Sequence, residues 1–185
     1  MYYWQVRKYP PLKEGEENKP KIPTWTSIID IGRTYNGVSL SMNEYLSIEE
    51  KYVKAVEIYM NSIQVHELEI YLISKLREEL FTEHILKYPK CYSQEIVESY
   101  YSLQDGSLLT GKQIEHIVRL GMREDVACQL RNGDKFFLNF SYDYYMDIGS
   151  SILCEDAIME IRNLGLFIDL WEWPYEGNVW ENSVE

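Results

Sequence analysis

The sequence predicts an α+β domain in which N-terminal helices are followed by an antiparallel, hairpin-containing sheet with a further helix and strand. Three observations predict this class. Apolar residues recur at helical spacing between positions 41 and 120, they alternate with other residues between 126 and 142, and an Asn-Gly turn signal interrupts the alternating run. Helices that precede strands in this way are typical of α+β proteins. We expect a single domain over residues 1–185, because a chain of this length can bury a core without disulfide bonds or a bound metal.

The N-terminal part of the chain is expected to be irregular. Positions 10–24 hold four prolines and many charged residues, so residues 1–24 are predicted to be a loosely held arm. Residues 25–32 can form a short strand, and Asn36 with Gly37 then supplies a turn.

Three helices are expected before position 104. Ser41 and Glu44 have the spacing of a capping box, so a helix is predicted to begin at Ser41. The residues expected on its buried side are Tyr45, Tyr52, Val53, Val56 and Met60. A second helix is predicted from Val65 to about Leu80, with a buried stripe formed by Val65, Leu68, Leu72, Leu76 and Leu80. A third helix is predicted over residues 93–103.

The second half of the chain combines helices with a hairpin. Thr110 and Gln113 repeat the capping-box spacing, and Gly121 is expected to end the helix that follows them. Residues 126–130 and 136–142 alternate as two strands around Asn132-Gly133, the pair favoured in a type I′ turn. A last helix is predicted over residues 155–164, then a strand over 166–171, and an acidic tail over 174–185.

Charge is distributed unevenly along the chain. The formal net charge is −12, and residues 142–185 hold ten acidic residues with a single basic one, Arg162. A protein that binds nucleic acid directly needs Lys and Arg facing phosphates, so this distribution argues against that class. A surface of one sign attracts a partner of the other sign, so the chain favours a cationic protein partner.

Catalytic and metal-binding signatures are missing from the sequence. There is no Gly-rich phosphate loop, no HExxH or GxSxG motif and no metal-spaced Cys/His cluster. The three cysteines are far apart, which is typical of buried thiols in a reducing compartment. No apolar run resembles a signal peptide or approaches the length of a membrane span. We therefore expect a cytoplasmic protein that has no cofactor, is not an enzyme and does not bind a membrane.

Three segments together resemble a known family. They are residues 30–37 (DIGRTYNG) running into 40–45 (LSMNEY), residues 119–124 (RLGMRE), and residues 140–149 (FSYDYYMDIG). Their order and spacing are similar to those of bacterial contact-dependent growth-inhibition immunity proteins, over most of residues 25–150. The chain differs from the family pattern at four positions, where it has Ala127, Asn139, Ser141 and Asp147.

The resemblance implies a protein that binds the C-terminal toxin domain of a large delivered protein and blocks it. Many such toxins are basic nucleases, and an EndoU-like RNase is the partner that we expect first. Acidic and aromatic residues near the end of the chain are the predicted contacts, since aromatic anchors carry much of the binding energy of interfaces. These toxin-binding candidates are Asp143, Tyr144, Tyr145, Asp147, Asp169, Trp171, Glu172, Trp173, Tyr175 and Glu176.

Some alternatives remain open at this level. Strand alternation puts Tyr142 and Tyr144 on the apolar side of the hairpin, so Tyr144 can belong to the core as well as to an interface, and so can Trp171. There are three rival functions: a small hydrolase or transferase with an acidic cleft, a nucleic-acid mimic that inhibits some other protein, and a structural subunit of a larger assembly.

Overall fold

The architecture is built on one large sheet. The computed structural model describes residues 1–10 and 24–171, so residues 11–23 and 172–185 lie outside this description. The sheet has seven strands in the order β5-β4-β6-β7-β8-β1-β9, and every neighbouring pair is antiparallel. The strands are β1 Tyr2–Arg7, β4 Glu67–Lys75, β5 Leu108–Thr110, β6 Val126–Asn132, β7 Phe136–Ser141, β8 Tyr145–Ser150 and β9 Phe167–Leu170. A separate small hairpin pairs β2 Thr34–Tyr35 with β3 Val38–Ser39.

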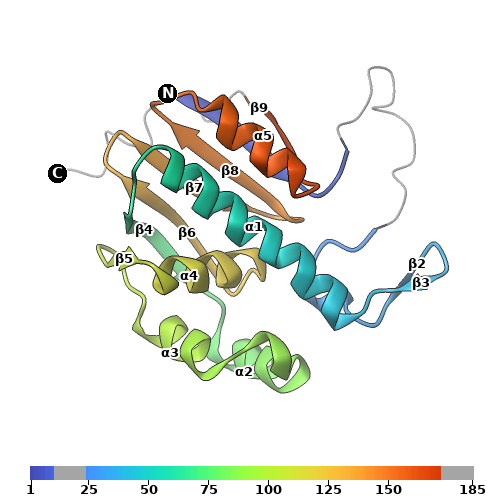
Figure 1. Cartoon of the computed structure of the whole chain (residues 1–185). Helices are drawn as coiled ribbons and strands as arrows, with labels where there is room; N and C mark the ends of the chain where they lie inside the picture. The colour runs from blue at the N-terminus through green and yellow to red at the C-terminus, as the bar shows by residue number, and fades with distance from the viewer. Residues whose placement is uncertain (11–23, 172–185) are drawn as a thin grey trace.

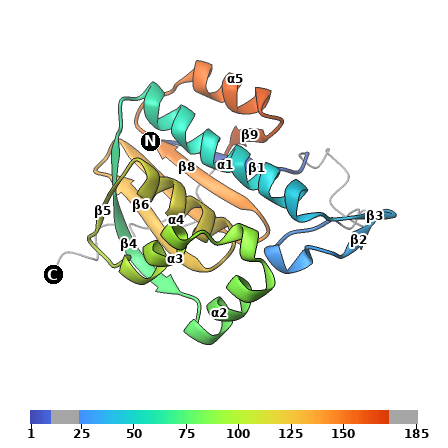
Figure 2. The same cartoon turned by 60° about the horizontal axis from the view of Figure 1, so that its bottom comes forward.

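Five α-helices accompany the sheet and confirm the predicted α+β class. They are α1 Met42–Ser62, α2 Glu78–Lys87, α3 Gln94–Ser102, α4 Lys112–Met122 and α5 Glu155–Asn163. Two short 3₁₀ helices cover Ile28–Asp30 and Pro89–Cys91. Helices α1, α4 and α5 lie over one face of the sheet, while α2 and α3 form a pair beside α4 (Figures 1 and 2). The rings of Phe81 in α2 and Tyr100 in α3 stack with centroids 3.6 Å apart, which ties this pair together.

The helix predicted to begin at Ser41 is confirmed. The Ser41 hydroxyl accepts a hydrogen bond from the Glu44 backbone N–H at 3.1 Å, which satisfies one of the free donors at the start of α1. All the residues predicted for its buried side are buried. The Trp4 indole N–H donates to the Tyr59 hydroxyl at 3.1 Å, so this hydrogen bond joins α1 to β1. The helix predicted over residues 93–103 is confirmed as α3, and the helix and strand predicted over 155–164 and 166–171 are confirmed as α5 and β9.

The predicted hairpin of β6 and β7 is present, but its turn differs. Asn132 pairs with Phe136, and the Lys135 N–H donates to the Asn132 carbonyl at 3.0 Å. Of the residues between the two strands, Gly133 alone has a positive φ, 48°. A type I′ turn needs positive φ at two successive residues, so the prediction of that turn type is wrong.

The sequence predicted that Gly121 ends its helix, but Gly121 lies inside α4. The helix continues to Met122, and Gly121 is buried where the helix crosses β7. A Cβ atom at this position would lie 2.5 Å from Cδ2 of Phe140. Gly121 is therefore required for a close approach between helix and sheet.

Two predicted segments have the wrong secondary structure. Residues 67–75 form strand β4, where a helix was expected, because Leu68 and Ile70 enter the core in the alternating pattern of a strand. Residues 25–32 contain a 3₁₀ helix over Ile28–Asp30 instead of a strand. The prediction of a loosely held N-terminal arm is also wrong for residues 2–7. They form β1, an inner strand of the sheet that pairs with both β8 and β9. The rest of that arm, residues 11–23, and the predicted acidic tail lie outside the described residues.

Candidate functional site

The turn between β7 and β8 has an unusual backbone. The Tyr145 N–H donates to the Tyr142 carbonyl at 3.3 Å, and the two central residues, Asp143 and Tyr144, have φ angles of 60° and 63°. Positive φ at both central positions is the signature of a type I′ turn. This conformation costs a residue other than glycine roughly 1–2 kcal/mol, so the surrounding structure must hold the turn in place.

The hydroxyl groups of two tyrosines hold the turn in place. The Tyr52 hydroxyl donates to the Tyr144 carbonyl at 2.7 Å, and the Tyr9 hydroxyl donates to the Asp143 carbonyl at 3.0 Å. The Tyr144 ring itself is 2% exposed and packs edge-on against Trp25, Tyr45 and Tyr52, with centroids 4.9, 5.7 and 5.4 Å away. Burial raises the pKa of Tyr144 well above 10. Tyr144 therefore belongs to the core and lacks the exposed surface that a binding anchor needs.

Tyr142, which strand alternation predicted to face the core, is exposed at this turn. The residue is 80% exposed. It lies beside the exposed Asp143 at the tip of the hairpin. Burial raises the pKa of the neighbouring Glu124 carboxyl, a backbone hydrogen bond from Asp143 lowers it, and the Asp143 carboxylate raises it again. The tip therefore combines one large aromatic side chain with two nearby carboxyl groups.

A second face of the sheet continues from this turn. Asp147 of β8 and Asp169 of β9 both align with Gln5 of β1, and Tyr145 is two residues from Asp147, so these side chains share one face. It is the face opposite α1, and none of the described helices covers it (Figure 1). The Tyr145 ring lies 5.7 Å from the ring of Tyr9.

The two aspartates on this face differ in their surroundings. Asp169 is half exposed and forms an ion pair with Arg7 at 2.5 Å. Asp147 is 4% exposed, and its Oδ2 accepts hydrogen bonds from Ser141 at 3.1 Å and Asn139 at 3.4 Å, whereas its Oδ1 is buried without a partner. Burial raises the pKa of Asp147, and the nearby polar side chains of Ser141, Asn139 and Gln5 oppose that rise.

The remaining predicted contacts are at or beyond the end of the described chain. Trp171 is 36% exposed, and its backbone N–H donates to the carbonyl of Tyr3 in β1 at 2.9 Å. Glu172, Trp173, Tyr175 and Glu176 lie outside the described residues.

The described acidic residues after position 142 do not gather on one face. Asp147 and Asp169 are on the sheet face opposite the helices, and Asp147 is buried. The exposed acids Glu155, Asp156 and Glu160 are on α5, which packs with α1 over the other face. The expectation of a single acidic docking face is therefore wrong for this part of the chain, because a strand and a helix on opposite sides of the sheet carry the charge.

Residues 30–45, 119–124 and 140–149 meet around the first half of α1. Arg123 is 1% exposed and donates from Nε and Nη2 to the Glu49 carboxylate at 2.7 and 2.6 Å. Arg119 bridges Glu49 and Glu50 at 3.1 and 2.5 Å. Burial would lower the pKa of Arg123, but the charge and hydrogen bonds of Glu49 raise it. These motif residues hold α4 to α1 and have a structural role.

A buried aspartate extends this polar cluster. Asp125 accepts from the Tyr92 hydroxyl at 2.7 Å and lies 2.8 Å from Nδ1 of His84, so it links α2 to the end of α4. In the first motif, Asp30 is similarly structural, since it accepts from the Thr26 N–H at 2.8 Å and pairs with Arg33 at 2.8 Å.

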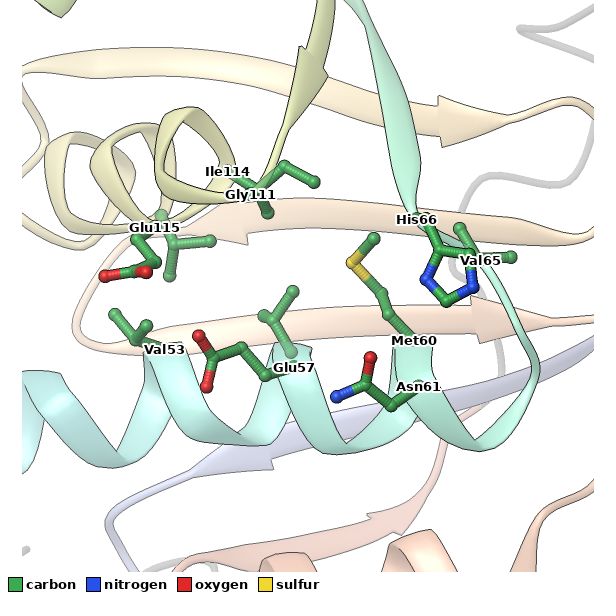
Figure 3. A pocket seen from close by; sticks show the side chains of 11 residues that line it. Val53, Glu57, Met60, Asn61, Val65, His66, Gly111, Ile114 and Glu115 are labelled. Atoms are coloured by element: carbon green, nitrogen blue, oxygen red, sulfur yellow. The ribbon is translucent and has the colours of Figure 1, made fainter.

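A hollow of about 400 Å³ lies between α1 and α4, near the start of β4 (Figure 3). Its floor is apolar and its rim carries Glu57, Asn61, His66 and Glu115. Sequence reasoning did not identify it, because its two walls are about 60 positions apart in the chain. The spacing of Val53, Val56 and Met60 on one helix and of Ile114 and Val118 on another indicated only two apolar faces.

Burial keeps two of the cysteine thiols in their protonated form. Burial raises the pKa of the Cys91 thiol to about 11 and that of Cys128 to about 12. Within residues 1–10 and 24–171, no three His, Cys, Asp or Glu side chains are grouped so that they could hold a metal ion. None of the helices in these ranges has the length and apolar character that crossing a bilayer requires.

No family model, curated protein or solved structure was found to match the chain.

Proposed function

We propose that this chain is an immunity protein that binds and inhibits a cognate contact-dependent growth-inhibition toxin in the cytoplasm of the cell that makes it. The partner is a basic RNase domain, EndoU-like in the first instance, and the immunity protein covers its active-site cleft. The chain carries out no reaction of its own in this role.

The observation that carries the proposal is the exposed Tyr142 on a strained, tightly held turn. A tyrosine that is 80% exposed offers a large contact area with few rotatable bonds, and interface hot spots are enriched in this residue. The hydrogen bonds from Tyr52 and Tyr9 fix the turn before any partner arrives. Little conformational entropy is then lost on binding, and backbone strain concentrates at functional sites.

Charge supports the same proposal. The chain has a net charge of −12, and a nuclease presents Lys and Arg to the phosphates of its substrate. Attraction between the two accelerates their encounter. Asp143 puts a carboxyl group next to Tyr142, and Glu124 lies near Asp143. Tyr145, Asp169 and Trp171 extend the contact surface along the sheet. The acids of α5, on the other face, contribute to long-range attraction without touching the partner.

The proposal is tested by mixing the protein with candidate toxin RNase domains and following RNA cleavage. We expect inhibition at a one-to-one ratio with the cognate domain. Replacing Tyr142→Ala should weaken binding by at least about 30-fold, as expected for a hot spot worth about 2 kcal/mol. Tyr101→Ala is the matched control, because Tyr101 is 53% exposed on α3, away from the turn.

Two results would contradict the proposal. Cleavage that continues at excess protein with every candidate domain would remove the immunity role. Equal inhibition by the Tyr142 and Tyr101 variants would move the interface away from the β7–β8 turn.

A further inference from the structure

The hollow between α1 and α4 has the shape and chemistry of a binding groove. Its floor is made of apolar side chains from both helices and from the segment that joins α1 to β4, namely Val53, Val56, Met60, Val65, Ile114 and Val118. The volume of about 400 Å³ is within the range of small-ligand sites. Such a floor favours an unbranched hydrocarbon chain over a hydrated polar group.

Two carboxylates stand over this floor. Glu57 projects from α1 and Glu115 from α4, and Figure 3 shows both at the same end of the groove. Among the described residues, neither takes part in an ion pair within 4.0 Å, whereas the nearby Arg119 is already paired with Glu49 and Glu50. The pKa of Glu57 is raised by burial and then by the charges of Glu115 and Glu50, and Lys54 and Arg119 offset only part of this rise. A cation placed between the two carboxylates would relieve their mutual repulsion.

We propose that this groove binds a lysine side chain presented by a protein partner. The four methylene groups of lysine lie along the apolar floor, and the ammonium sits between Glu57 and Glu115. Lysine fits better than arginine because an ammonium is a compact charge with three donors that two separate carboxylates can share. The planar guanidinium is matched to a single carboxylate in a bidentate pair. The identity of the partner rests on the proposed function, but the chemistry of the groove does not.

The groove can be tested without any toxin. The probe is Nα-acetyl-lysine methylamide, titrated into the ¹⁵N-labelled protein while amide shifts are followed by NMR. Its norleucine counterpart has the same chain without the ammonium, and the arginine counterpart and spermidine serve as competing cations. We expect saturable shifts confined to the groove, including residues 57–66 and 111–118, with a Kd on the order of millimolar.

Variants separate charge from packing. Glu57→Gln with Glu115→Gln should weaken binding of the lysine probe at least about fivefold, the loss expected for one charge-assisted contact worth about 1 kcal/mol. Glu79→Gln with Glu83→Gln is the matched control, because both residues are exposed on α2. That control should bind as the unmodified protein does. Circular dichroism of both double variants shows whether each is folded, so a lost signal cannot be mistaken for lost charge.

Several results would overturn the inference. Equal binding of the norleucine probe would show that the groove recognises only hydrocarbon. Tighter binding of the arginine probe would exclude the preference for lysine, and tighter binding of spermidine would show a small polyamine site instead of a protein contact. Unchanged binding in the Glu57 and Glu115 double variant would place the probe elsewhere. None of these results depends on RNase inhibition, so the groove and the immunity role can fail separately.

Discussion

The buried pair of Glu49 and Arg123 gives the sharpest stability prediction. The Glu49 side chain is 0% exposed and accepts three hydrogen bonds, two from Arg123 and one from Arg119. Glu49→Gln keeps the shape of the side chain and removes its charge, so no cavity is created. Arg123, 1% exposed, then carries a buried charge without a counter-ion.

The expected effect is large because breaking one side of a buried ion pair costs roughly 3–5 kcal/mol. For a chain of this size, each kcal/mol lowers the melting temperature by about 2–4 °C, so the midpoint should fall by roughly 6–20 °C. The measurement is urea and thermal unfolding followed by circular dichroism.

A matched control makes the reasoning refutable. Glu50 also pairs with Arg119, at 2.5 Å, but its side chain is 42% exposed, so Glu50→Gln should cost about 0–1 kcal/mol. Replacing both partners, Glu49→Leu with Arg123→Met, should be less harmful than Glu49→Gln alone, because no charge is left buried. If Glu49→Gln and Glu50→Gln destabilise the fold equally, the ion pair does not have the role that we assign to it.

Two further predictions concern packing and pH. Gly121→Ala should destabilise the protein by about 1–3 kcal/mol in urea unfolding, although alanine favours helices, because the new Cβ would meet the Phe140 ring at 2.5 Å. Adding Phe140→Leu should recover part of the loss, and a stabilising Gly121→Ala would contradict the close approach. Asp147→Asn should raise the unfolding free energy at pH 7 by about 1 kcal/mol, because burial disfavours the charge of the carboxylate and the amide carries none. The folded pKa of Asp147 is above its ordinary value of 3.8, so the folded state binds the proton more tightly, and ionisation destabilises the fold as pH rises through that window. The advantage of the asparagine should therefore disappear below about pH 4, and an advantage that stays constant with pH would refute this cause.

Local signals predicted the elements whose structure depends on neighbouring residues in the chain. Ser41 and Glu44 predict the start of α1 because a cap needs only four consecutive residues. The alternation on either side of residues 132–135 predicts β6 and β7 because a hairpin is local. The helices at 93–103 and 155–164 follow from the same kind of pattern.

Elements that depend on distant partners were not predictable in this way. Residues 65–76 fit a helical stripe and a strand alternation equally well, and the pairing of β4 with β6 decides between them. Strand β1 has no turn signal of its own, and it forms because β8 and β9, more than 135 residues away, supply its hydrogen bonds.

The candidate site shows the same division. The sequence by itself determined that the chain is strongly acidic, that aromatic and acidic residues gather after position 140, and that a hairpin over residues 126–142 precedes most of them. The second hairpin, between β7 and β8, comes from the tertiary structure. Only the tertiary structure decided which aromatic residue is exposed. Tyr52 and Tyr9 hold the turn with positive φ at Asp143 and Tyr144, which breaks the strand alternation, buries Tyr144 and turns Tyr142 outward. Charge and composition are properties of the chain, whereas exposure depends on contacts between segments far apart in it.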